Sequence, residues 1–435
     1  MQYWAIFKLK VYILRILLIN YRYFVSGGPE RYMFNVKALL EQAGHEIVPF
    51  SIKSRNNINS NYERYFAEPL GRQDEAYFDK ARLTPRFIWD VLARLFYSFH
   101  VKKRLKILIA DTRPDVAYIL HHYNKLSPSV IDACKDAGLE VYVRLSDYFL
   151  LCPQAHFLRK GTPCEKCLDN GLYEAVVGRC VKGSFFGSLL KAVALFMHRH
   201  IFQCYHRVDG FICTTQFMKQ KMQKGGWPVK KLFVVPTFMH LADNKERNYK
   251  KTVEDRKYIL YFGRFTYEKG LDLLVEAYAK TDLPYRNIEL MLVGGTRAQL
   301  DKLVGSGTIS PTVENHVHLH DFLPSERLAH LIHHALFVVV PSRWYENMPN
   351  TVLEAYAHGK AVIAMNIGSM PEIVEEGITG LLFEQESSTD LSNKLEWLAN
   401  EPYELKELEN GVIRERAKLN PEHHLVRISE ILFGK

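Results

Sequence analysis

Two carboxylates stand eight positions apart in the second half of the chain, Glu346 in an expected loop and Glu354 in the helix expected after it. Pro349 lies between them, and proline is accepted at a helix start because that position needs no backbone N–H. The free amides of the first helical turn would belong to Asn350, Thr351 and Val352. Carboxylates at two depths can bind two sets of hydroxyls, and amides between them can bind phosphate. The segment therefore predicts a site for a ligand that carries both groups.

A basic pair lies upstream in the stretch GRFTYEKG, where Arg264 and Lys269 follow an apolar run and precede a helical pattern. Anions are favoured at this place because a helix N-terminus presents free N–H groups and a partial positive charge. A diphosphate would fit there. The alternative is an ordinary basic surface loop, and the placement between two glycines at the end of an expected strand argues against it.

The elements that must position these charged residues are read from apolar runs that alternate with helical patterns. Such runs predict strands buried on both faces, as in a parallel sheet covered by helices. In the first half the expected strands are residues 15–20, 45–51, 115–120, 140–146, 210–215 and 232–237. In the second half they are residues 258–263, 288–294, 316–320, 336–342, 361–365 and 380–383. The predicted fold class is α/β, with two Rossmann-like, doubly wound domains that face a central cleft.

The domain organisation follows from this pattern. We expect an N-terminal Rossmann-like domain at 1–238, a polar linker at 239–257, a C-terminal Rossmann-like domain at 258–410, and C-terminal helices at 411–435 that pack back toward the N-terminal domain. With 435 residues, 47% of them hydrophobic, the chain is long enough to form two cores. Ligands of such sheets bind at the carboxyl ends of the strands, so we expect the site in the cleft.

Four ordered motifs carry a resemblance to a known family. SGGPERYMFNVKALLEQAGHEI, GRFTYEKG, ENMPNTVLEAYAHGKAVIA and GSMPEIVEEGITGLLF resemble motifs of the retaining glycosyltransferases of family 4, which have the GT-B fold. Together the motifs span most of the chain. The resemblance implies that the N-terminal domain binds an acceptor and that the C-terminal domain binds a nucleotide sugar.

The resemblance also implies roles for individual residues. Arg264 and Lys269 match the basic pair that holds the donor diphosphate. Glu346, a candidate catalytic group, matches a residue in contact with the donor sugar, and Glu354 matches one that binds the nucleotide ribose. A glycine loop, where the backbone approaches the donor and a side chain would obstruct it, is matched by Gly27 and Gly28.

The activity implied by the resemblance is transfer of a hexosyl unit, with retention at the anomeric carbon, from a UDP-sugar or GDP-sugar. The acceptor would be lipid-linked or an oligosaccharide, in surface polysaccharide or lipopolysaccharide biosynthesis. Because the chain has no Asp-x-Asp pair, we expect basic side chains and helix amides to neutralise the leaving diphosphate, with no cofactor required for transfer. Two alternatives are a nucleotide-sugar epimerase or hydrolase on the same fold, and a basic, metal-binding nucleic-acid interaction module.

Two further residues are candidates for the acceptor side. RLSDYFLLCP resembles the family's loop with His-Asp-Tyr or His-Asp-Phe, with Ser146 in place of the histidine and Asp147 retained. His121 lies in PDVAYILHHYNKLSPSV, which resembles a His- and Asn-rich segment of the family although the histidines are displaced. We therefore expect Asp147 and His121 to be catalytic or acceptor-binding polar groups, and a helix cap is the alternative role for Asp147.

Four cysteines form a separate constellation, C-x11-C-x2-C-x12-C, made by Cys152, Cys164, Cys167 and Cys180. The CEKC pair has the spacing of a zinc knuckle, and four thiolates complete a tetrahedral structural site. We expect a structural zinc, or an iron–sulfur cluster, that organises the loop after Asp147. The alternative is that the four cysteines are free.

Charge is distributed unevenly between the two halves. Residues 1–235 hold 35 Lys and Arg against 19 Asp and Glu, a net of +16, and the remainder holds 22 against 29, a net of −7. A basic N-terminal half predicts an anionic partner, and the resemblance favours an acceptor that bears phosphate or lies on an anionic membrane surface. Nucleic acid is not expected as a partner, because no recognition-helix or aromatic stacking pattern is present.

The expected location is cytoplasmic, with peripheral attachment to the inner face of the membrane. The apolar residues 1–24 include Lys8, Lys10 and Arg15, which interrupt every window of the roughly 20 apolar residues that a membrane span needs. They also lack a signal cleavage site. The apolar residues 185–202 are expected to form a core helix, with an interfacial helix as the alternative.

Overall fold

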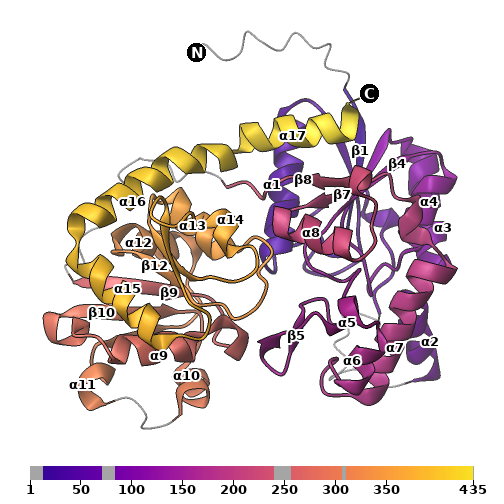
Figure 1. Ribbon diagram of the computed structural model, residues 1–435. Helices are drawn as coiled ribbons and strands as arrows, with labels where there is room; N and C mark the ends of the chain where they lie inside the picture. Colours follow the sequence, from indigo (N-terminus) through magenta and orange to yellow (C-terminus); the bar gives the residue numbers. More distant parts are fainter. Residues whose placement is uncertain (1–12, 71–83, 240–255, 306–309, 435) are drawn as a thin grey trace.

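The structure, a computed structural model, describes residues 13–70, 84–239, 256–305 and 310–434. Two α/β domains lie side by side and are bridged along one edge by the C-terminal helices (Figure 1). Each domain is built on a six-stranded parallel sheet with helices packed around it. The predicted fold class is therefore confirmed. Most of the linker expected at 239–257 lies outside the described residues.

The N-terminal sheet has the strand order β2-β1-β3-β4-β7-β8. Its strands are β1 (Arg15–Asn20), β2 (Glu46–Phe50), β3 (Val116–His121), β4 (Glu140–Arg144), β7 (Gly210–Cys213) and β8 (Leu232–Val234). The helices of this domain are α1 (Gly28–Gln42), α2 (Pro85–Leu95), α3 (Phe99–Thr112), α4 (Ser129–Asp136), α5 (Lys166–Asp169), α6 (Tyr173–Val177), α7 (Phe185–Phe196) and α8 (Gln216–Lys224). A small hairpin of β5 (Leu158–Arg159) and β6 (Thr162–Pro163) stands outside the main sheet.

The C-terminal sheet has the strand order β11-β10-β9-β12-β13-β14. Its strands are β9 (Lys257–Phe262), β10 (Ile288–Val293), β11 (Val317–His320), β12 (Val338–Val340), β13 (Val362–Met365) and β14 (Gly380–Phe383). The helices are α9 (Leu271–Ala279), α10 (Arg297–Val304), α11 (Pro311–Glu314), α12 (Ser325–His334), α13 (Asn350–Ala357), α14 (Met370–Ile373) and α15 (Ser388–Asn400).

Strand order explains where each domain opens a crevice. In the C-terminal sheet β9 and β12 are neighbours, and the chain leaves them toward opposite edges, so the loops after Phe262 and Val340 diverge at adjacent strand ends. In the N-terminal sheet the same reversal falls between β1 and β3, which end at Asn20 and His121. Ligands of doubly wound sheets bind at such points because no connection covers them.

Every apolar run that was predicted to be a strand forms one, with ends shifted by at most three residues. The central strands are buried on both faces, which is why they read as continuous apolar runs. In β1, Ile16, Leu17, Leu18 and Ile19 are all at most 1% exposed. Leu17 pairs with Val48 on one side and with Ala117 on the other.

The prediction that residues 185–202 form a core helix is wrong. The segment forms α7 and a π-helical turn, Met197–Ile201, and lies at the surface. Three of the four buried side chains of α7 are small, Ser188, Ala192 and Ala194, and the fourth is Leu195. Its aromatic residues face out, and Phe186 is 77% exposed. Small inward residues let the helix approach its neighbours closely, so apolarity all along the segment does not mean burial all round.

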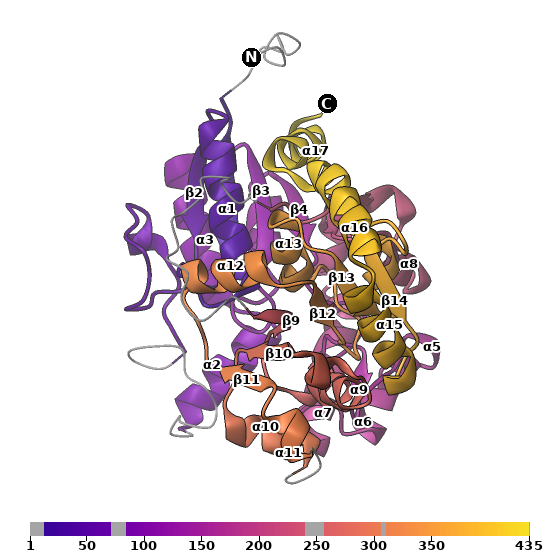
Figure 2. The same cartoon turned by 90° about the vertical axis from the view of Figure 1, so that its left-hand side faces the viewer.

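The last helices, α16 (Pro402–Glu415) and α17 (Pro421–Phe433), run one after the other along the outside of both domains (Figure 2). α16 packs on α15, whereas α17 packs on α1. Ile428 and Leu432 of α17 are buried with apolar residues of the N-terminal domain. His424 is also buried there, 2.9 Å from the Pro236 carbonyl oxygen. The expected boundary at 410 falls inside α16.

Candidate active site

A cavity of about 400 Å³ lies between the domains and takes its walls from both. This volume lies in the range of about 300 to 1,000 Å³ that is usual for small-molecule sites. The predicted site residues that line it are Gly28, His121, Asp147, Arg264, Glu346 and Asn350. Those that do not reach its wall are Gly27, Lys269, Thr351, Val352 and Glu354.

Arg343 joins the two loops at the C-terminal crevice. It is 4% exposed, and its guanidinium donates to the Tyr267 carbonyl oxygen at 3.1 Å while its backbone N–H donates to that of Glu268 at 2.9 Å. Gly270 completes the contact with φ +68°, and a Cβ there would lie 1.9 Å from the Pro341 carbonyl oxygen. The loop that carries Arg264 and Lys269 and the loop that carries Glu346 are therefore held together as one rigid wall of the cavity.

Lys269 and Glu346 form a buried ion pair on this wall. Lys269 Nζ lies 2.5 Å from Glu346 Oε1, which also accepts from Ser342 Oγ at 3.0 Å. Burial alone would raise the pKa of Glu346, but the Lys269 charge and these hydrogen bonds hold it below the usual range. Arg264 differs, because its side chain is 69% exposed at the mouth of the cavity. Of the basic pair, only Arg264 lines the cavity, and Lys269 acts through Glu346.

The N-termini of α1 and α13 meet across the cavity. Gly28 opens α1 and Asn350 opens α13, and a Cβ on Gly28 would lie 2.3 Å from Asn350 Nδ2. Gly27 has no such neighbour, and its extended φ of −176° suits any residue. The glycine that this approach requires is therefore Gly28. Two helix N-termini together present a strong partial positive charge to the cavity.

The expectation of free amides at the start of α13 needs one correction. The Val352 N–H donates to the Pro349 carbonyl oxygen at 3.1 Å, and its side chain is fully buried. A tightened first turn uses this amide, so it is not available to a ligand. Thr351 points its hydroxyl toward the Phe262 carbonyl oxygen, 3.4 Å away, and so toward the end of β9.

Glu354 is engaged with the opposite domain. Its carboxylate accepts from Arg31 of α1 at 2.6 Å, and the pair joins the two domains beside the cavity. Burial raises the pKa of Glu354, and the Arg31 charge opposes this shift. The residue expected to bind a ribose thus already accepts a hydrogen bond from the N-terminal domain.

Asp147 is the centre of the N-terminal wall. Tyr123 donates to its Oδ2 at 2.7 Å, the Phe149 N–H donates to its Oδ1 at 3.0 Å, and His121 Nε2 lies 4.0 Å from Oδ2. Burial raises the pKa of Asp147 to about 6 and lowers that of His121 to about 4. Asp147 lies in a loop and closes a short turn onto Phe149, so the helix-cap alternative is wrong.

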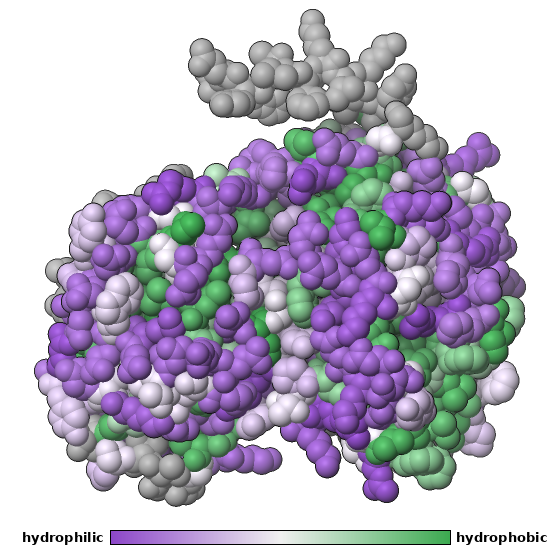
Figure 3. Space-filling view, viewed as in Figure 1, coloured by the Kyte–Doolittle hydropathy of each residue, from purple (hydrophilic) through white to green (hydrophobic). Residues whose placement is uncertain are grey.

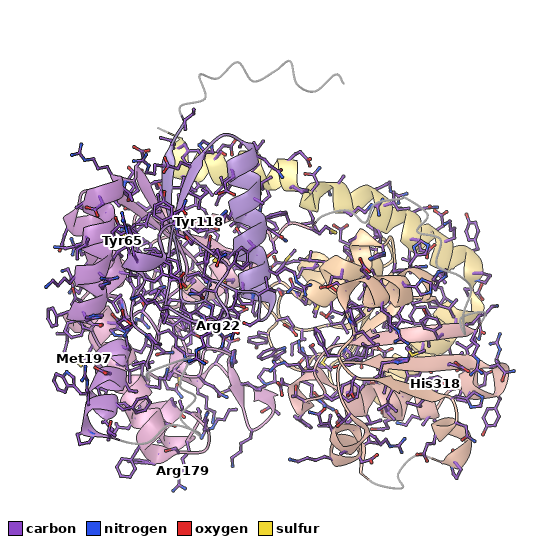
Figure 4. The ribbon with its side chains drawn as sticks, turned by 180° about the vertical axis from the view of Figure 1, so that it is seen from behind. Arg22, Tyr65, Tyr118, Arg179, Met197 and His318 are labelled. Carbon is purple, nitrogen blue, oxygen red and sulfur yellow. The ribbon has the colours of Figure 1, made fainter. Side chains whose placement is uncertain are left out.

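The sequence analysis missed Arg144, which lines the cavity although it is only 3% exposed. Its Nη2 donates to Thr237 Oγ1 at 2.6 Å, and its guanidinium lies 3.7 Å over the ring of Tyr32. Tyr32 shares a hydrogen bond of 2.9 Å with Tyr118, which lies within the N-terminal sheet (Figure 4). Arg144 lies within an otherwise apolar run that was expected to be a strand, and this was the available signal. A buried arginine must have polar partners.

Asn347 and Glu372, also missed, connect the domains. Asn347 Nδ2 donates to the Leu145 carbonyl oxygen at 3.0 Å, and its side-chain oxygen accepts from Thr214. Glu372 accepts from the backbone N–H of Gln216 at 2.7 Å, at the start of α8. Nothing in the sequence pairs these residues, because each contact joins positions more than 130 residues apart.

Two further findings concern the described residues as a whole. Within them no helix is long and apolar enough to cross a membrane. In the same part of the chain, no three or more His, Cys, Asp and Glu side chains stand together as a metal-ligand set. All seven cysteines are described, and none forms a disulfide.

Comparison with known proteins matches the C-terminal half most clearly. Residues 243–416 match the sequence model of the family described as Glycosyl transferases group 1. An uncharacterised glycosyltransferase of Methanocaldococcus jannaschii is 29% identical over 47% of this chain and 53% of its own length. A lipopolysaccharide 1,2-N-acetylglucosaminetransferase of Salmonella typhimurium is 30% identical over 36% of this chain and 43% of its own length. The chain spans about half, or less, of the length of these relatives.

Solved structures extend the likeness to both domains. The crystal structure of Anabaena HepE in complex with UDP matches 97% of this chain and 100% of its own, with a TM-score of 0.60 and 16% identity. At this identity the likeness concerns the fold. The chain has the GT-B fold, with the family match confined to the half that carries the two loops.

Proposed function

We propose that this protein is a retaining glycosyltransferase of family 4 that moves a hexosyl unit from a nucleotide-diphosphate sugar to a lipid-linked or oligosaccharide acceptor. The observation that carries the proposal is the convergence of two helix N-termini, those of α1 and α13, on one cavity. Arg264 and Glu346 line the same cavity. Helix N-termini and a guanidinium suit a diphosphate, and a carboxylate suits sugar hydroxyls. The match of the C-terminal half to Glycosyl transferases group 1 supports this assignment.

In the proposed reaction, the bond between the anomeric carbon and the diphosphate oxygen breaks. The acceptor oxygen forms its new bond to that carbon on the same face, and its proton passes to the leaving oxygen. The two helix N-termini and Arg264 stabilise the negative charge that develops on the diphosphate. Glu346, kept ionised by Lys269, holds hydroxyls of the donor sugar. No protein nucleophile is needed in this scheme.

The acceptor would lie against the N-terminal wall. Asp147, His121 and Arg144 line this side of the cavity. Asp147 is the group suited to accept a hydrogen bond from the reacting hydroxyl, since Tyr123 fixes one of its oxygens and the cavity reaches it. His121 is neutral at pH 7, because burial lowers its pKa to about 4, so it contributes a neutral polar group.

The relatives support the substrate class. HepE was solved with UDP, and the Salmonella relative is named for transfer of N-acetylglucosamine in lipopolysaccharide. We infer a UDP-sugar donor and a saccharide acceptor of surface polysaccharide or lipopolysaccharide biosynthesis. Neither an epimerase or hydrolase nor a nucleic-acid module has any support among these relatives.

An exposed apolar face supports peripheral attachment to the inner membrane surface. Along α7 and the turn after it, the exposed large side chains are Phe185, Phe186, Leu189, Val193, Phe196 and Ile201. Tyr173 and Val177 of α6 are also exposed, and Figure 3 shows hydrophobic surface gathered at the lower right of the molecule, over α6 and α7. The exposed basic residues Arg179 and Lys182 lie between the two helices. Aromatic residues with basic neighbours are typical of surfaces that bind anionic lipid.

The experiment that tests the donor site is a thermal-shift screen with UDP, GDP, ADP and dTDP, followed by mass spectrometry of products with candidate lipid-linked acceptors. We expect one nucleotide to raise the melting temperature and its sugar conjugate to support transfer. Replacing Arg264 by alanine should weaken nucleotide binding about tenfold, about 1.4 kcal/mol, because Arg264 is the member of the basic pair that lines the cavity. Unchanged affinity would refute the proposed diphosphate site.

Metal independence and membrane attachment have separate tests. Transfer should survive dialysis against EDTA, and activity restored by manganese alone would contradict the proposal.

Vesicles of phosphatidylglycerol should co-sediment the protein better than vesicles of phosphatidylcholine. Phe186→Ser should reduce this binding, whereas Phe322→Ser, at a side chain 88% exposed on the other domain, should not. Equal binding by both variants would contradict the assigned surface.

A further inference from the structure

Arg144, the last residue of β4, is a buried cation without an anionic partner. Its side chain lines the cavity although the residue is only 3% exposed. Nη2 donates to the neutral hydroxyl of Thr237, whereas Nη1 is buried and has no hydrogen-bond partner among the described residues. Burying a charge costs free energy unless an opposite charge and hydrogen bonds compensate for it. The guanidinium is therefore suited to bind an anion that does not belong to the chain.

The two carboxylates that line the cavity, among the described residues, are engaged elsewhere. Asp147 accepts from the Tyr123 hydroxyl at 2.7 Å. Glu346 forms its ion pair with Lys269. Since neither carboxylate is paired with Arg144, the cavity wall leaves the charge of this guanidinium uncompensated.

The aromatic groups beside Arg144 are neutral. The guanidinium lies 3.7 Å over the ring of Tyr32, whose face stabilises a cation but offers Nη1 no oxygen acceptor. Burial raises the pKa of Tyr32 and that of Tyr118, so both phenols keep their protons at pH 7. Burial, followed by the charge of Arg144, lowers the pKa of His424 to about 3, so this ring is neutral as well. None of these groups supplies the missing negative charge.

The diphosphate of the proposed donor is assigned to other groups. Arg264 and the helix N-termini at Gly28 and Asn350 line the cavity and suit it. Arg144 comes from the N-terminal wall, where Asp147 also lies. A second anionic group, carried by one of the substrates, would therefore be needed to neutralise Arg144.

The size of the charge favours a carboxylate over a phosphate. Among the described residues of the N-terminal domain, Arg144 is the one arginine or lysine that lines the cavity. His121 adds no charge at pH 7, because burial lowers its pKa to about 4. A phosphate monoester carries about −1.5 to −2 charges at pH 7, so a single guanidinium would leave part of that charge uncompensated. A carboxylate carries one charge, and its planar shape fits a guanidinium.

We propose that Arg144 binds the carboxylate of an acidic sugar, such as a uronic acid, and thereby makes the protein selective for an acidic saccharide. Nη1 would donate to the carboxylate in a charge-assisted hydrogen bond. This role rests on the proposed function, because it specifies a substrate of the same cavity. The position of Arg144 on the wall with Asp147 favours the acceptor as the source of the carboxylate, and the donor sugar is the other source.

Transfer assays with two matched acceptors test the preference. One is an oligosaccharide that ends in glucuronic acid, and the other is the same oligosaccharide with that carboxyl group reduced to an alcohol. Wild-type kcat/KM should be on the order of a hundredfold higher for the acidic acceptor, because truncating one partner of a desolvated charge pair costs at least this much. Arg144→Met should remove most of this preference through a higher KM for the acidic acceptor alone. Arg144→Lys keeps the charge without the planar fork and should retain part of it.

Thr237→Val separates recognition of the carboxylate from a structural role of Arg144. This variant removes the Nη2 contact and leaves the guanidinium in place, so it should keep the preference between the two acceptors. Isothermal titration calorimetry should give the same UDP affinity for Arg144→Met and the wild type, because Arg264 lies in the other domain. Unchanged UDP binding also shows that Arg144→Met remains folded.

Binding measurements without turnover identify the source of the carboxylate. Saturation-transfer NMR in the presence of UDP compares methyl glucuronoside with methyl glucoside, and calorimetry compares UDP-glucuronate with UDP-glucose. A preference for the glucuronoside that Arg144→Met abolishes places the carboxylate on the acceptor. A preference for UDP-glucuronate that the same variant abolishes places it on the donor. Protein that binds the acidic sugar but transfers nothing would refute the proposed function and leave the role of Arg144 standing.

Three results would overturn this role. The first is wild-type protein that binds and uses acidic and neutral sugars equally, whether as donor or as acceptor. The second is an equal loss for the acidic and the reduced acceptor in Arg144→Met, reproduced by Thr237→Val, which would assign Arg144 to the structure of the domain. The third is tighter binding of glucose 6-phosphate than of glucuronate that is lost in Arg144→Met, which would assign the site to a phosphate.

Discussion

Arg31 of α1 and Glu354 of α13 form an ion pair of 2.6 Å that joins the two domains beside the cavity. Their side chains are 48% and 30% exposed, so the pair itself contributes only about 0 to 1 kcal/mol. The pair matters because of where it holds the Glu354 carboxylate. The carboxylate expected to bind the nucleotide ribose faces the other domain, and a ribose would have to share or replace the Arg31 contact.

Glu354→Gln should weaken UDP binding about tenfold, about 1.4 kcal/mol, because an amide is a poorer acceptor for ribose hydroxyls than a carboxylate. Arg31→Ala removes the other half of the ion pair and should change UDP affinity by no more than about twofold, since the pair is partly exposed and contributes little. Isothermal titration calorimetry measures both. If Arg31→Ala weakened binding as much as Glu354→Gln, the interdomain contact rather than the ribose would explain the effect.

Lys269→Ala should destabilise the fold, because it leaves the buried Glu346 carboxylate without its cation. Removing one partner of such a pair costs about 3 to 5 kcal/mol, and denaturant unfolding measures it. Adding Glu346→Gln to this variant should recover part of the loss, since no unpaired charge is then buried. Arg264→Ala is the matched control, and because Arg264 is mostly exposed it should weaken nucleotide binding with little change in unfolding free energy. Equal stability of Lys269→Ala and the wild type would contradict the buried pair.

Replacement of Asp147 by asparagine should have opposite effects on stability and on activity. Its pKa is about 6 in the folded protein against 3.8 for an ordinary aspartate, so the folded state holds this proton more tightly than the unfolded state. The corresponding stability is present below about pH 4 and is lost as the pH rises to about 6, a total of up to about 3 kcal/mol. Asp147→Asn should therefore be more stable than the wild type at pH 7.5 and similar to it at pH 4.

The same variant should lose transfer activity, because an amide accepts a hydrogen bond from the acceptor hydroxyl less well than a carboxylate. Wild-type transfer should fall as the pH drops through about 6, where Asp147 takes up its proton. Rates measured from pH 5 to 8 in both proteins check this. An Asp147→Asn variant that is more stable yet fully active would show that this carboxylate has no role in transfer.

Gly28→Ala should impair donor use, because its Cβ would lie 2.3 Å from Asn350 Nδ2 and would displace this amide, which lines the cavity. A shift of about 1 Å at a reacting centre costs on the order of a hundredfold in rate. Gly27→Ala is the control next to it, since its Cβ would meet no atom closer than 3.7 Å. Kinetics with a UDP-sugar measure both variants. Equal losses in the two would contradict the specific approach of Gly28 to α13.

The sequence predicted the elements well for physical reasons that can be named. Strands such as β1 are buried on both faces, so their residues must be apolar whatever lies around them. The loops with Arg264 and Glu346 were recognisable because each follows a strand and precedes a helix start, marked by glycines around Arg264 and by Pro349 after Glu346. The prediction of a core helix at residues 185–202 was wrong because an apolar composition does not say which residues of a helix face inward.

The sequence did not predict which residues far apart in the chain contact each other. Lys269 was predicted as a ligand of the diphosphate, and the structure shows that its charge is used by Glu346. Arg144 was not recognised at all, because its partners Thr237 and Tyr32 come from other elements.

The amino-acid sequence by itself determined the two parallel sheets, their connecting helices and the residue types at each strand end, because burial and helix periodicity are local properties. Only the tertiary structure decided which of these residues share a cavity, since strand order brings β9 beside β12 and the domain arrangement brings Gly28 beside Asn350. Charges and hydrogen bonds act over a few ångströms in space, and separation along the chain does not fix that distance.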